Sequence, residues 1–377
     1  MKKGKLLHQF LLFIALSGFG GFIVSLTGLP IGWMIGTLLT ATVLSIFYPA
    51  IVKLPPNQNG LPKYWLYIGQ VILGIELGQR VNSTVLSVFH ESWLSIVIML
   101  VLSVVISLGS GLFLWKYSKL DMLTSFFATT PGGLSAMPGI AEEFGANTGA
   151  VSIVQTLRAF LVILTIPIAI TIWFGHTASD VVTVAVAGFD IQHVGVTVLF
   201  AVLAVAGYKA GKLLKLPAPW LIGAMLSVAG VKIIGSAWIG FDFIAWWPHS
   251  LLIISQVLIG ASIGSRFTKE MFVGLGRMIV VSMVSTIGMI VAMLACAYAV
   301  SLFSDISFLT SGLAFAPGGI AEMSTTALVL NGDATFVVTV QVLRVIVVCV
   351  TLPPLFRLLR YVELRRKSIP LRSKEVH

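Results

Sequence analysis

The stretch Thr-Thr-Pro-Gly-Gly-Leu-Ser-Ala-Met at residues 129–137 decides the fold, because a close copy of it occurs later in the chain. The copy reads Phe-Ala-Pro-Gly-Gly-Ile-Ala-Glu-Met at residues 315–323, offset by 186 residues. Proline removes a backbone donor and glycine adds backbone freedom, so a Pro-Gly-Gly triplet predicts a break in a helix. Inside a membrane, such a break is tolerated only where protein or a water-filled cavity satisfies the freed backbone groups. We therefore expect the two broken segments to meet near the membrane centre and to form the functional site.

The composition indicates an integral membrane protein. Of the 377 residues, 57% are hydrophobic and 10% are charged, and the mean hydropathy is +1.01, whereas soluble domains carry about 25% charged residues. The formal net charge of +10 comes from basic residues in short loops and at both ends, which is the positive-inside pattern of membrane proteins. No stretch is long and polar enough to fold as a DNA-binding domain, so direct binding of nucleic acid is not expected.

Three further motifs occur twice at nearly the same offset, which indicates an internal duplication. They are VQTLR at 154–158 with VQVLR at 340–344, LPIGWMIG at 29–36 with LPAPWLIG at 216–223, and GQVILGIELGQR at 69–80 with SQVLIGASIGSR at 255–266. Each half contains six apolar segments. In the first half they are roughly 7–28, 30–48, 64–82, 93–115, 121–144 and 148–174, and in the second half roughly 191–214, 217–237, 248–266, 278–303, 306–328 and 334–356.

The charges of the loops predict the topology. The lysines near the N-terminus and the basic residues of the tail 357–377 place both termini in the cytoplasm of a plasma-membrane protein. The linker 176–190 contains acidic residues but no Lys or Arg, which places it outside. Each half, 1–175 and 191–356, then crosses the membrane an odd number of times, so one of its six segments does not cross. Arg80 and Lys232 fit this assignment less well, because they lie near the outer ends of helices.

The predicted fold is therefore an all-α polytopic membrane protein built from two inverted repeats. Each repeat contains about five transmembrane helices and one Pro-Gly-Gly hairpin, either re-entrant or part of a broken spanning helix. Inverted repeats with discontinuous helices are typical of secondary transporters, whose sites lie at the repeat interface near the midplane.

Arg158 and Arg344 are the strongest candidates for the site. Each lies about ten residues into its segment, or roughly 15 Å at 1.5 Å per residue, which is about half of a hydrocarbon core. An arginine at that depth costs about 3 to about 17 kcal/mol unless it faces a partner or a watered cavity. Gln155 and Gln341 precede the arginines by three residues and share their helix face. The arginines could bind an anionic substrate or alternate with a proton, or they could hold the broken hairpins by donating to free carbonyls.

Two carboxylates are candidates for proton coupling, because a carboxylate in a low dielectric has a raised affinity for protons. Glu322 lies in the second hairpin, where it could carry a proton or contact a ligand, or serve as a static partner of Arg344. Glu76 lies in the third apolar segment, and its counterpart in the second half is Ser262. The remaining candidate site residues border the breaks or are polar residues repeated in apolar helices. They are Thr130, Pro131, Gly132, Gly133, Ser135, Pro317, Gly318, Gly319, Gln70 and Gln256.

On these residues the chain resembles the AbrB-type membrane protein family, which has a duplicated membrane domain. The resemblance is carried by the two Pro-Gly-Gly hairpins, the two Gln-x-Leu-Arg helices and the two Leu-Pro-x-x-Trp starts, and it spans nearly all of residues 5–360. Members carry labels as ammonia monooxygenases or as regulators of gene expression. The family is also similar to cation/proton antiporters and anion transporters with inverted repeats, which implies transport.

The leading hypothesis is a secondary transporter of a small solute, with anions among the candidates. The alternative is a membrane-embedded regulator or sensor that affects gene expression indirectly. A monooxygenase ranks last, because the sequence shows no membrane cluster of His, Cys or carboxylates with metal-ligand spacing, so we expect no cofactor and no enzyme activity. Expected partners are the solute and anionic lipid at the basic tail, and a homodimer is left open.

Overall fold

The computed structural model contains only helices and connecting segments in the part of the chain that it describes. It describes residues 2–29, 31–48, 60–81, 84–131, 137, 141–142, 144–174, 191–214, 216–238, 243, 245–272 and 275–367. The first half contains α1 (Lys2–Ser25), α2 (Gly32–Phe47), α3 (Lys63–Arg80), α4 (Thr84–Ser118), α5 (Met122–Thr129) and α7 (Thr148–Phe174). The second half contains α8 (Ile191–Leu213), α9 (Pro219–Trp238), α10 (His249–Gly264), the short 3₁₀ helix η2 (Lys269–Phe272), α11 (Gly276–Phe303), α12 (Phe308–Phe315), α13 (Ile320–Val329) and α14 (Ala334–Lys367).

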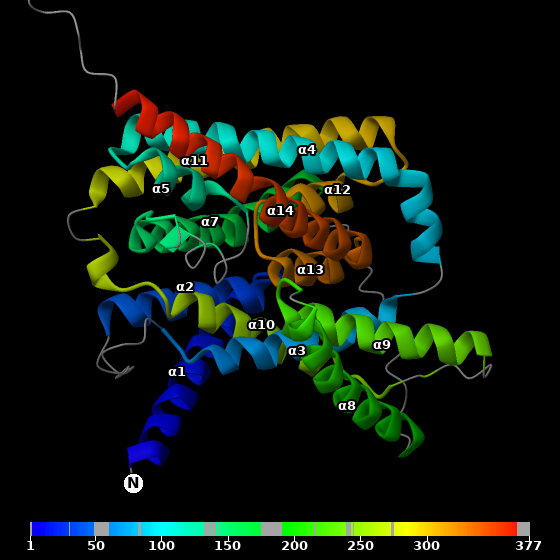
Figure 1. Cartoon of the computed structure of the whole chain (residues 1–377). Coiled ribbons are helices and arrows are strands. Elements are labelled where there is room, and N and C mark those ends of the chain that lie inside the picture. The colour runs from blue at the N-terminus through cyan, green and yellow to red at the C-terminus, as the bar shows by residue number, and fades with distance from the viewer. Residues whose placement is uncertain are drawn as a thin grey trace, which may run out of the picture.

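The helices form two layers, each of which draws on both halves of the sequence (Figure 1). One layer contains α1, α2 and α3 together with α8, α9 and α10, and the other contains α4, α5, α7 and α11 to α14. Within the first layer, the third helix of each half packs on the second helix of the other half, so α3 contacts α9 and α10 contacts α2. The two halves are therefore interlocked and do not form separate domains.

Glycines allow the backbones of paired helices in the first layer to touch. A Cβ on Gly36 would overlap the carbonyl oxygen of Gly20 where α1 crosses α2. A Cβ on Gly223 would overlap the carbonyl oxygen of Gly207 where α8 crosses α9. Both residues of the second pair lie 187 positions after those of the first. Small residues permit such close approach, and van der Waals contact drives the association of helices inside a membrane.

The two segments that contain the Pro-Gly-Gly motifs each begin and end close together. In the second half, α12 ends at Phe315 and α13 begins at Ile320. The backbone N–H of Asp333, which follows α13, donates to Thr310 Oγ1 near the start of α12 at 3.2 Å. The two ends of this segment therefore lie together, as in a hairpin.

The first half contains the equivalent bond. The backbone N–H of Asn147 donates to Thr124 Oγ1 at 2.9 Å, so the residue before α7 lies beside the start of α5. Each of these two residues lies 186 positions before its counterpart in the second half. In Figure 1, α5 and α12 approach the centre of the molecule from opposite sides.

Four polar residues begin the helices of these segments. Asp121 accepts from the N–H of Thr124 at the start of α5, and Ser307 accepts from that of Thr310 at the start of α12. In the same way, Asn147 caps α7 and Asp333 caps α14. Asp, Asn and Ser are favoured at this position because their side chains satisfy N–H groups that have no partner within the helix. These caps fix where each hairpin begins and where the following helix starts.

The expectation of an all-helical polytopic membrane protein is confirmed. Among the described residues, five helices are long and apolar enough to cross a membrane, and five more are shorter and apolar. The predicted linker at 176–190 lies outside the described residues. The predicted tail begins inside a helix, because α14 continues to Lys367.

The close crossing of α8 and α9 can be tested with two alanines on the same helix. We expect Gly223→Ala to lower the free energy of unfolding by about 1–3 kcal/mol, as overpacking does, because the new methyl group meets backbone. Gly230→Ala is the matched control, since a Cβ on Gly230 meets nothing within 4 Å and alanine favours a helix. Thermal unfolding of the detergent-purified protein measures both, and equal stability of the two variants would contradict the crossing.

Candidate functional site

Arg344 on α14 is buried at the break between α12 and α13. Its Nη1 donates to the carbonyl oxygens of Phe315 at 3.2 Å and Ala316 at 2.7 Å, and its Nη2 donates to that of Gly318 at 3.4 Å. A planar guanidinium presents several donors in a fixed fork, which suits a row of carbonyls. Arg344 thus satisfies backbone acceptors that the break releases from the helix.

Gln341 lies one turn before this arginine and completes the cluster. Its Nε2 donates to the carbonyls of Leu313 at 2.9 Å and Ala316 at 3.1 Å. Its Oε1 accepts from Nη2 of Arg344. Gln341 is 0% exposed, so buried protein groups supply the donors for the carbonyl oxygens at the end of α12.

The same arrangement occurs at the first break. Nε2 of Gln155 donates to the carbonyl of Phe127 at 3.0 Å, and Nη1 of Arg158 donates to that of Thr129 at 2.7 Å. Each of these four residues lies 186 positions before its counterpart in the second half. Thr130 is buried as well, and its hydroxyl donates back to the carbonyl of Phe126 at 2.7 Å.

Each break also packs against the arginine-bearing helix of the other half. A Cβ on Gly318 would lie 2.9 Å from Val162 Cγ1 on α7, so glycine is needed for this approach. Val348, the counterpart of Val162 on α14, is buried in the cluster that contains Phe126 and Phe127 of α5. The predicted meeting of the two breaks is therefore supported by contacts in both directions.

The centre of the molecule carries an excess of positive charge. Arg158 and Arg344 are 5% and 2% exposed, and they lie close enough for their charges to repel each other. Among the described residues, the ion pair between Glu76 and Arg80 is the one within 4 Å, so no carboxylate pairs with either buried arginine. Burying an ion costs on the order of several kcal/mol even after relaxation. The cluster is therefore suited to an anion.

Glu322 is the buried carboxylate nearest the second break in sequence, at 6% exposed. It lies in the first turn of α13, and a Cβ on Gly319 would overlap its carboxylate, so the side chain folds back over the start of its own helix. Negative charge at that end is favoured by the helix dipole. Its charge interacts with that of Arg266, which follows α10 in the other layer. Among the described residues Glu322 forms no ion pair within 4 Å, and its role as a proton carrier or as a static partner of Arg344 stays a prediction.

Comparison with known proteins identifies the family. The family model described as "Transition state regulatory protein AbrB" matches residues 33–360. The chain belongs to the AbrB family. It is 49% identical over 374 residues to "Uncharacterized protein YhjN" of Bacillus subtilis (strain 168), covering 98% of this chain and 97% of the relative. It is 25% identical over 335 residues to "Putative regulator AbrB" of Escherichia coli (strain K12), covering 86% and 94%. The resemblance noted in the sequence is thereby confirmed.

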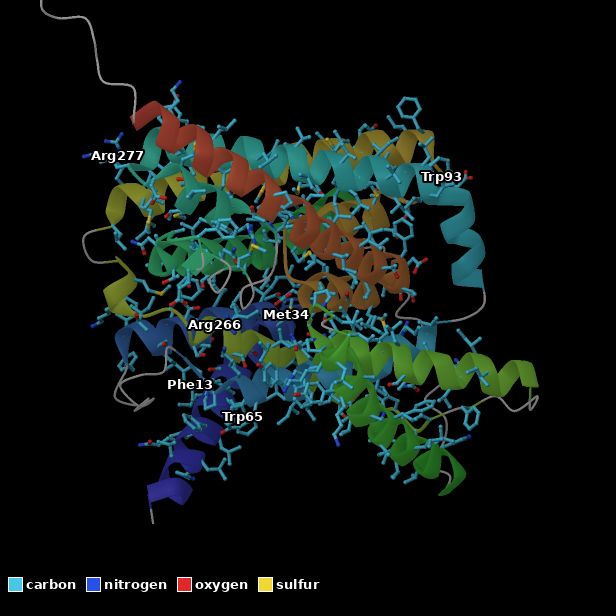
Figure 2. The ribbon with its side chains drawn as sticks, viewed as in Figure 1. Phe13, Met34, Trp65, Trp93, Arg266 and Arg277 are labelled. Carbon is cyan, nitrogen blue, oxygen red and sulfur yellow. The ribbon has the colours of Figure 1, made fainter. Side chains whose placement is uncertain are left out.

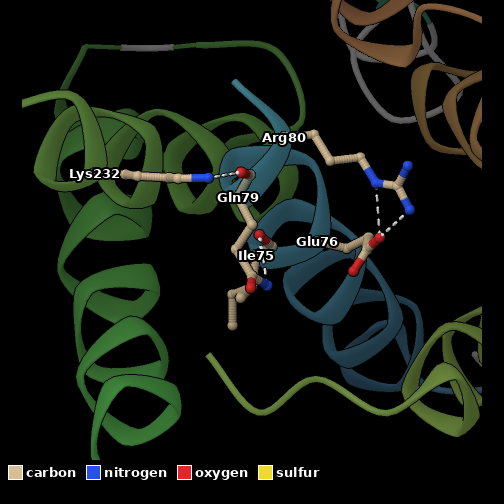
Figure 3. A network of polar contacts seen from close by, with 5 residues as sticks. All are labelled: Ile75, Glu76, Gln79, Arg80 and Lys232. Carbon is tan, nitrogen blue, oxygen red and sulfur yellow. Dashed lines mark hydrogen bonds and ion pairs between the residues drawn. The ribbon is translucent and has the colours of Figure 1, made fainter. Parts of the chain in front are cut away.

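The second carboxylate candidate of this AbrB-family chain, Glu76, is already paired. It forms an ion pair of 2.8 Å with Arg80 one turn later on α3 (Figure 3). On the same helix end, Nζ of Lys232 donates to the carbonyl of Gln79 at 2.5 Å. A cation at the end of a helix is favoured by its dipole. These contacts give partners to Arg80 and Lys232, the two basic residues that fit the predicted loop charges least well.

The remaining predicted site residues have different outcomes. Pro131 and Pro317 are buried at the breaks, Gln256 is buried with no partner for Oε1, and Gln70 is half-buried. Gln70 and Gln256 lie on α3 and α10, which contact each other. Gly132, Gly133 and Ser135 lie outside the described residues.

The sequence reasoning missed Thr124 and Thr310 as the hydroxyls that close the hairpins, and it missed the interaction of Arg266 with Glu322. The first could have been found, because the triplet Leu-Thr-Ser occurs at 123–125 and again at 309–311. The second could not, because it joins segments that are far apart in the chain.

The unequal bonding of the two arginines leads to a stability test. We expect Arg344→Gln to lower the melting temperature clearly, because hydrogen bonds from a charged donor contribute about 1.5–3 kcal/mol each and Arg344 makes several. Arg158→Gln should cost much less, since it removes one described bond and relieves the repulsion. Thermal unfolding of the purified variants in detergent measures the difference, and equal losses would refute this assignment.

Proposed function

We propose that this AbrB-family protein is a secondary transporter of a small anionic solute, working by alternating access at the interface of its two halves. The observation that carries the proposal is the pair of arginines buried at the helix breaks, which have no carboxylate partner among the described residues. An anion that binds between them supplies the missing countercharge. When it leaves, the repulsion returns, so occupancy of the site changes the electrostatic energy of the centre.

The arrangement of the helices supports transport over static binding. Both breaks lie in one layer and contact the other layer through α13 and α7. Helices broken at their centre and paired across two halves are the feature around which transporters alternate their access. Both halves supply a glutamine and an arginine to their break at equivalent positions, although the bonds are more numerous in the second half.

We propose that the protein lies in the plasma membrane with both termini in the cytoplasm. In Figure 2, Arg277 and Trp93 lie at opposite ends of the α4–α11 pair. Arg277 donates to the carbonyl of Tyr117 at 2.8 Å, close in sequence to Lys116 and Lys119. By the positive-inside rule this end faces the cytoplasm, where the basic tail meets anionic lipid.

Glu322 is the preferred proton-coupling residue in this proposal. It is buried, and the cation with which its charge interacts lies in the opposite layer. Glu76, by contrast, pairs with an arginine on its own helix. A relative movement of the layers changes the surroundings of Glu322 and leaves those of Glu76 nearly unchanged.

The transport proposal is tested by flux into proteoliposomes across a panel of organic and inorganic anions. We expect Arg158→Gln to reduce flux at least about ten-fold while the protein remains folded, because one removed charge-assisted contact is worth about that much or more. Arg277→Gln is the matched control, since it removes an exposed arginine at the end of the layer. Undiminished flux in Arg158→Gln, or the absence of flux for every anion, would overturn the proposal.

A membrane-embedded regulator is the second candidate. It is favoured by the descriptions of the matching family and of the Escherichia coli relative, both of which name a regulator. The end of α14 and the residues beyond it carry many basic side chains, which could contact a partner or lipid. In this case the site at the breaks would sense a solute and not move it.

Deletion of residues 365–377 separates the two candidates. We expect the truncated protein to keep its flux in proteoliposomes, because the deletion removes none of the groups at the breaks. A regulator that signals through this end should instead lose its effect on gene expression in cells. Full-length protein reconstituted at the same density is the control. Loss of flux on truncation would contradict the expectation that transport depends only on the groups at the breaks.

A further inference from the structure

The two glutamine–arginine pairs are alike in sequence and differ in their bonds. Gln341 Oε1 accepts from Arg344, whereas Gln155 Oε1 has no partner although the side chain is 0% exposed. The orientation of the Gln155 amide is fixed, because its NH₂ group must face the Phe127 carbonyl to which it donates. The opposite side of the amide therefore presents an acceptor that nothing in the described part of the chain uses.

Arg158 has an unused donor on the same helix face. Its one hydrogen bond to a described residue runs from Nη1 to the carbonyl of Thr129, and its Nε has no partner. Arg344 also leaves Nε without a partner, but its two Nη atoms bond to three carbonyls and to Gln341. Residues three apart on a helix are neighbours, so a free acceptor and a free charged donor lie side by side in the first half. An unmade bond at a buried polar atom is costly.

We propose that Gln155 and Arg158 form the recognition pair of the transport site and bind a small oxyanion that carries a hydroxyl group. An oxygen of the anion accepts from the Arg158 guanidinium, and the hydroxyl of the same ligand donates to Gln155 Oε1. Arg344 and Gln341 bond mainly to each other and to the second break, so they act as a fixed scaffold with a positive charge. This inference rests on the proposed transport of an anion and specifies its chemical class.

The donor on the ligand must be neutral. An ammonium group beside Gln155 would face the charges of Arg158 and Arg344, which already repel each other. An anion without any donor would set one of its oxygens against Gln155 Oε1 and leave that acceptor unsatisfied. Hydroxycarboxylates and hydrogen phosphate share the required chemistry, since each combines an anionic oxygen with an O–H.

Matched pairs of anions test the inference on the purified full-length protein. Lactate and propionate differ by one hydroxyl group, and hydrogen phosphate and sulfate differ by one proton on an oxyanion of the same shape. Binding is measured by calorimetry in detergent and transport by uptake into proteoliposomes. We expect the hydroxylated member of at least one pair to bind on the order of ten-fold more tightly, from the effect of one unsatisfied buried acceptor. The pair that shows the preference identifies whether the substrate is a hydroxycarboxylate or hydrogen phosphate.

Two glutamine variants locate the preference. Gln155→Leu should bring the ratio within a pair to about one, whereas Gln341→Leu should retain it, because the oxygen of Gln341 is already occupied by Arg344. A preference that survives in folded Gln155→Leu overturns the inference. If that variant does not fold, the wild-type ratio decides, and equal binding within both pairs, or binding of none of the four anions, overturns it.

The outcomes also separate this inference from the transport proposal. Selective binding without uptake would remove transport and leave the recognition pair in place. Uptake of anions without any preference for the hydroxylated member would remove the recognition pair and leave transport in place.

Discussion

Carbonyl groups freed at a helix break find no water inside a hydrocarbon layer, and the centre of this molecule is arranged around the side chains that satisfy them. In each half a glutamine and an arginine on the following helix supply the donors. Both side chains donate to carbonyls at the end of the short helix, and in the second half they also donate to carbonyls of the break. A charged residue at this depth is costly in isolation, but here it offsets the cost of several unsatisfied carbonyls.

Duplication accounts for how such a centre is built from simple parts. Neither hairpin is covered by its own half alone, because Gly318 packs on Val162 of α7 and Val348 of α14 packs with the first hairpin. The first layer also has contacts between the halves, since α3 packs on α9 and α10 packs on α2. The halves therefore support each other. Any ligand bound between the arginines contacts both halves.

Much of this architecture could be predicted from the sequence, because it is encoded in local motifs that occur twice. Pro317 and the glycines after it predicted a break, and the repeated Gln-x-Leu-Arg predicted polar groups facing it. The interaction of Glu322 with Arg266 could not be predicted, because it depends on how α13 sits against α10. The free oxygen of Gln155 could not be predicted either, because the two Gln-x-Leu-Arg motifs have the same residues at the named positions and differ only in their side-chain hydrogen bonds.

The charge interactions of the two repeated arginines in the first layer differ although their positions are equivalent. Arg80 pairs with Glu76 on its own helix, whereas Arg266 has Ser262 at the corresponding position and interacts with Glu322 in the other layer. An ion pair within one helix moves with that helix, so its distance does not change when the layers are displaced. A charge interaction between the layers changes with such a displacement, and its energy depends on the protonation of the carboxylate. With Ser262 on α10 where α3 has Glu76, and with Glu322 on α13, the second arginine therefore has a charge interaction that responds to movement of the layers.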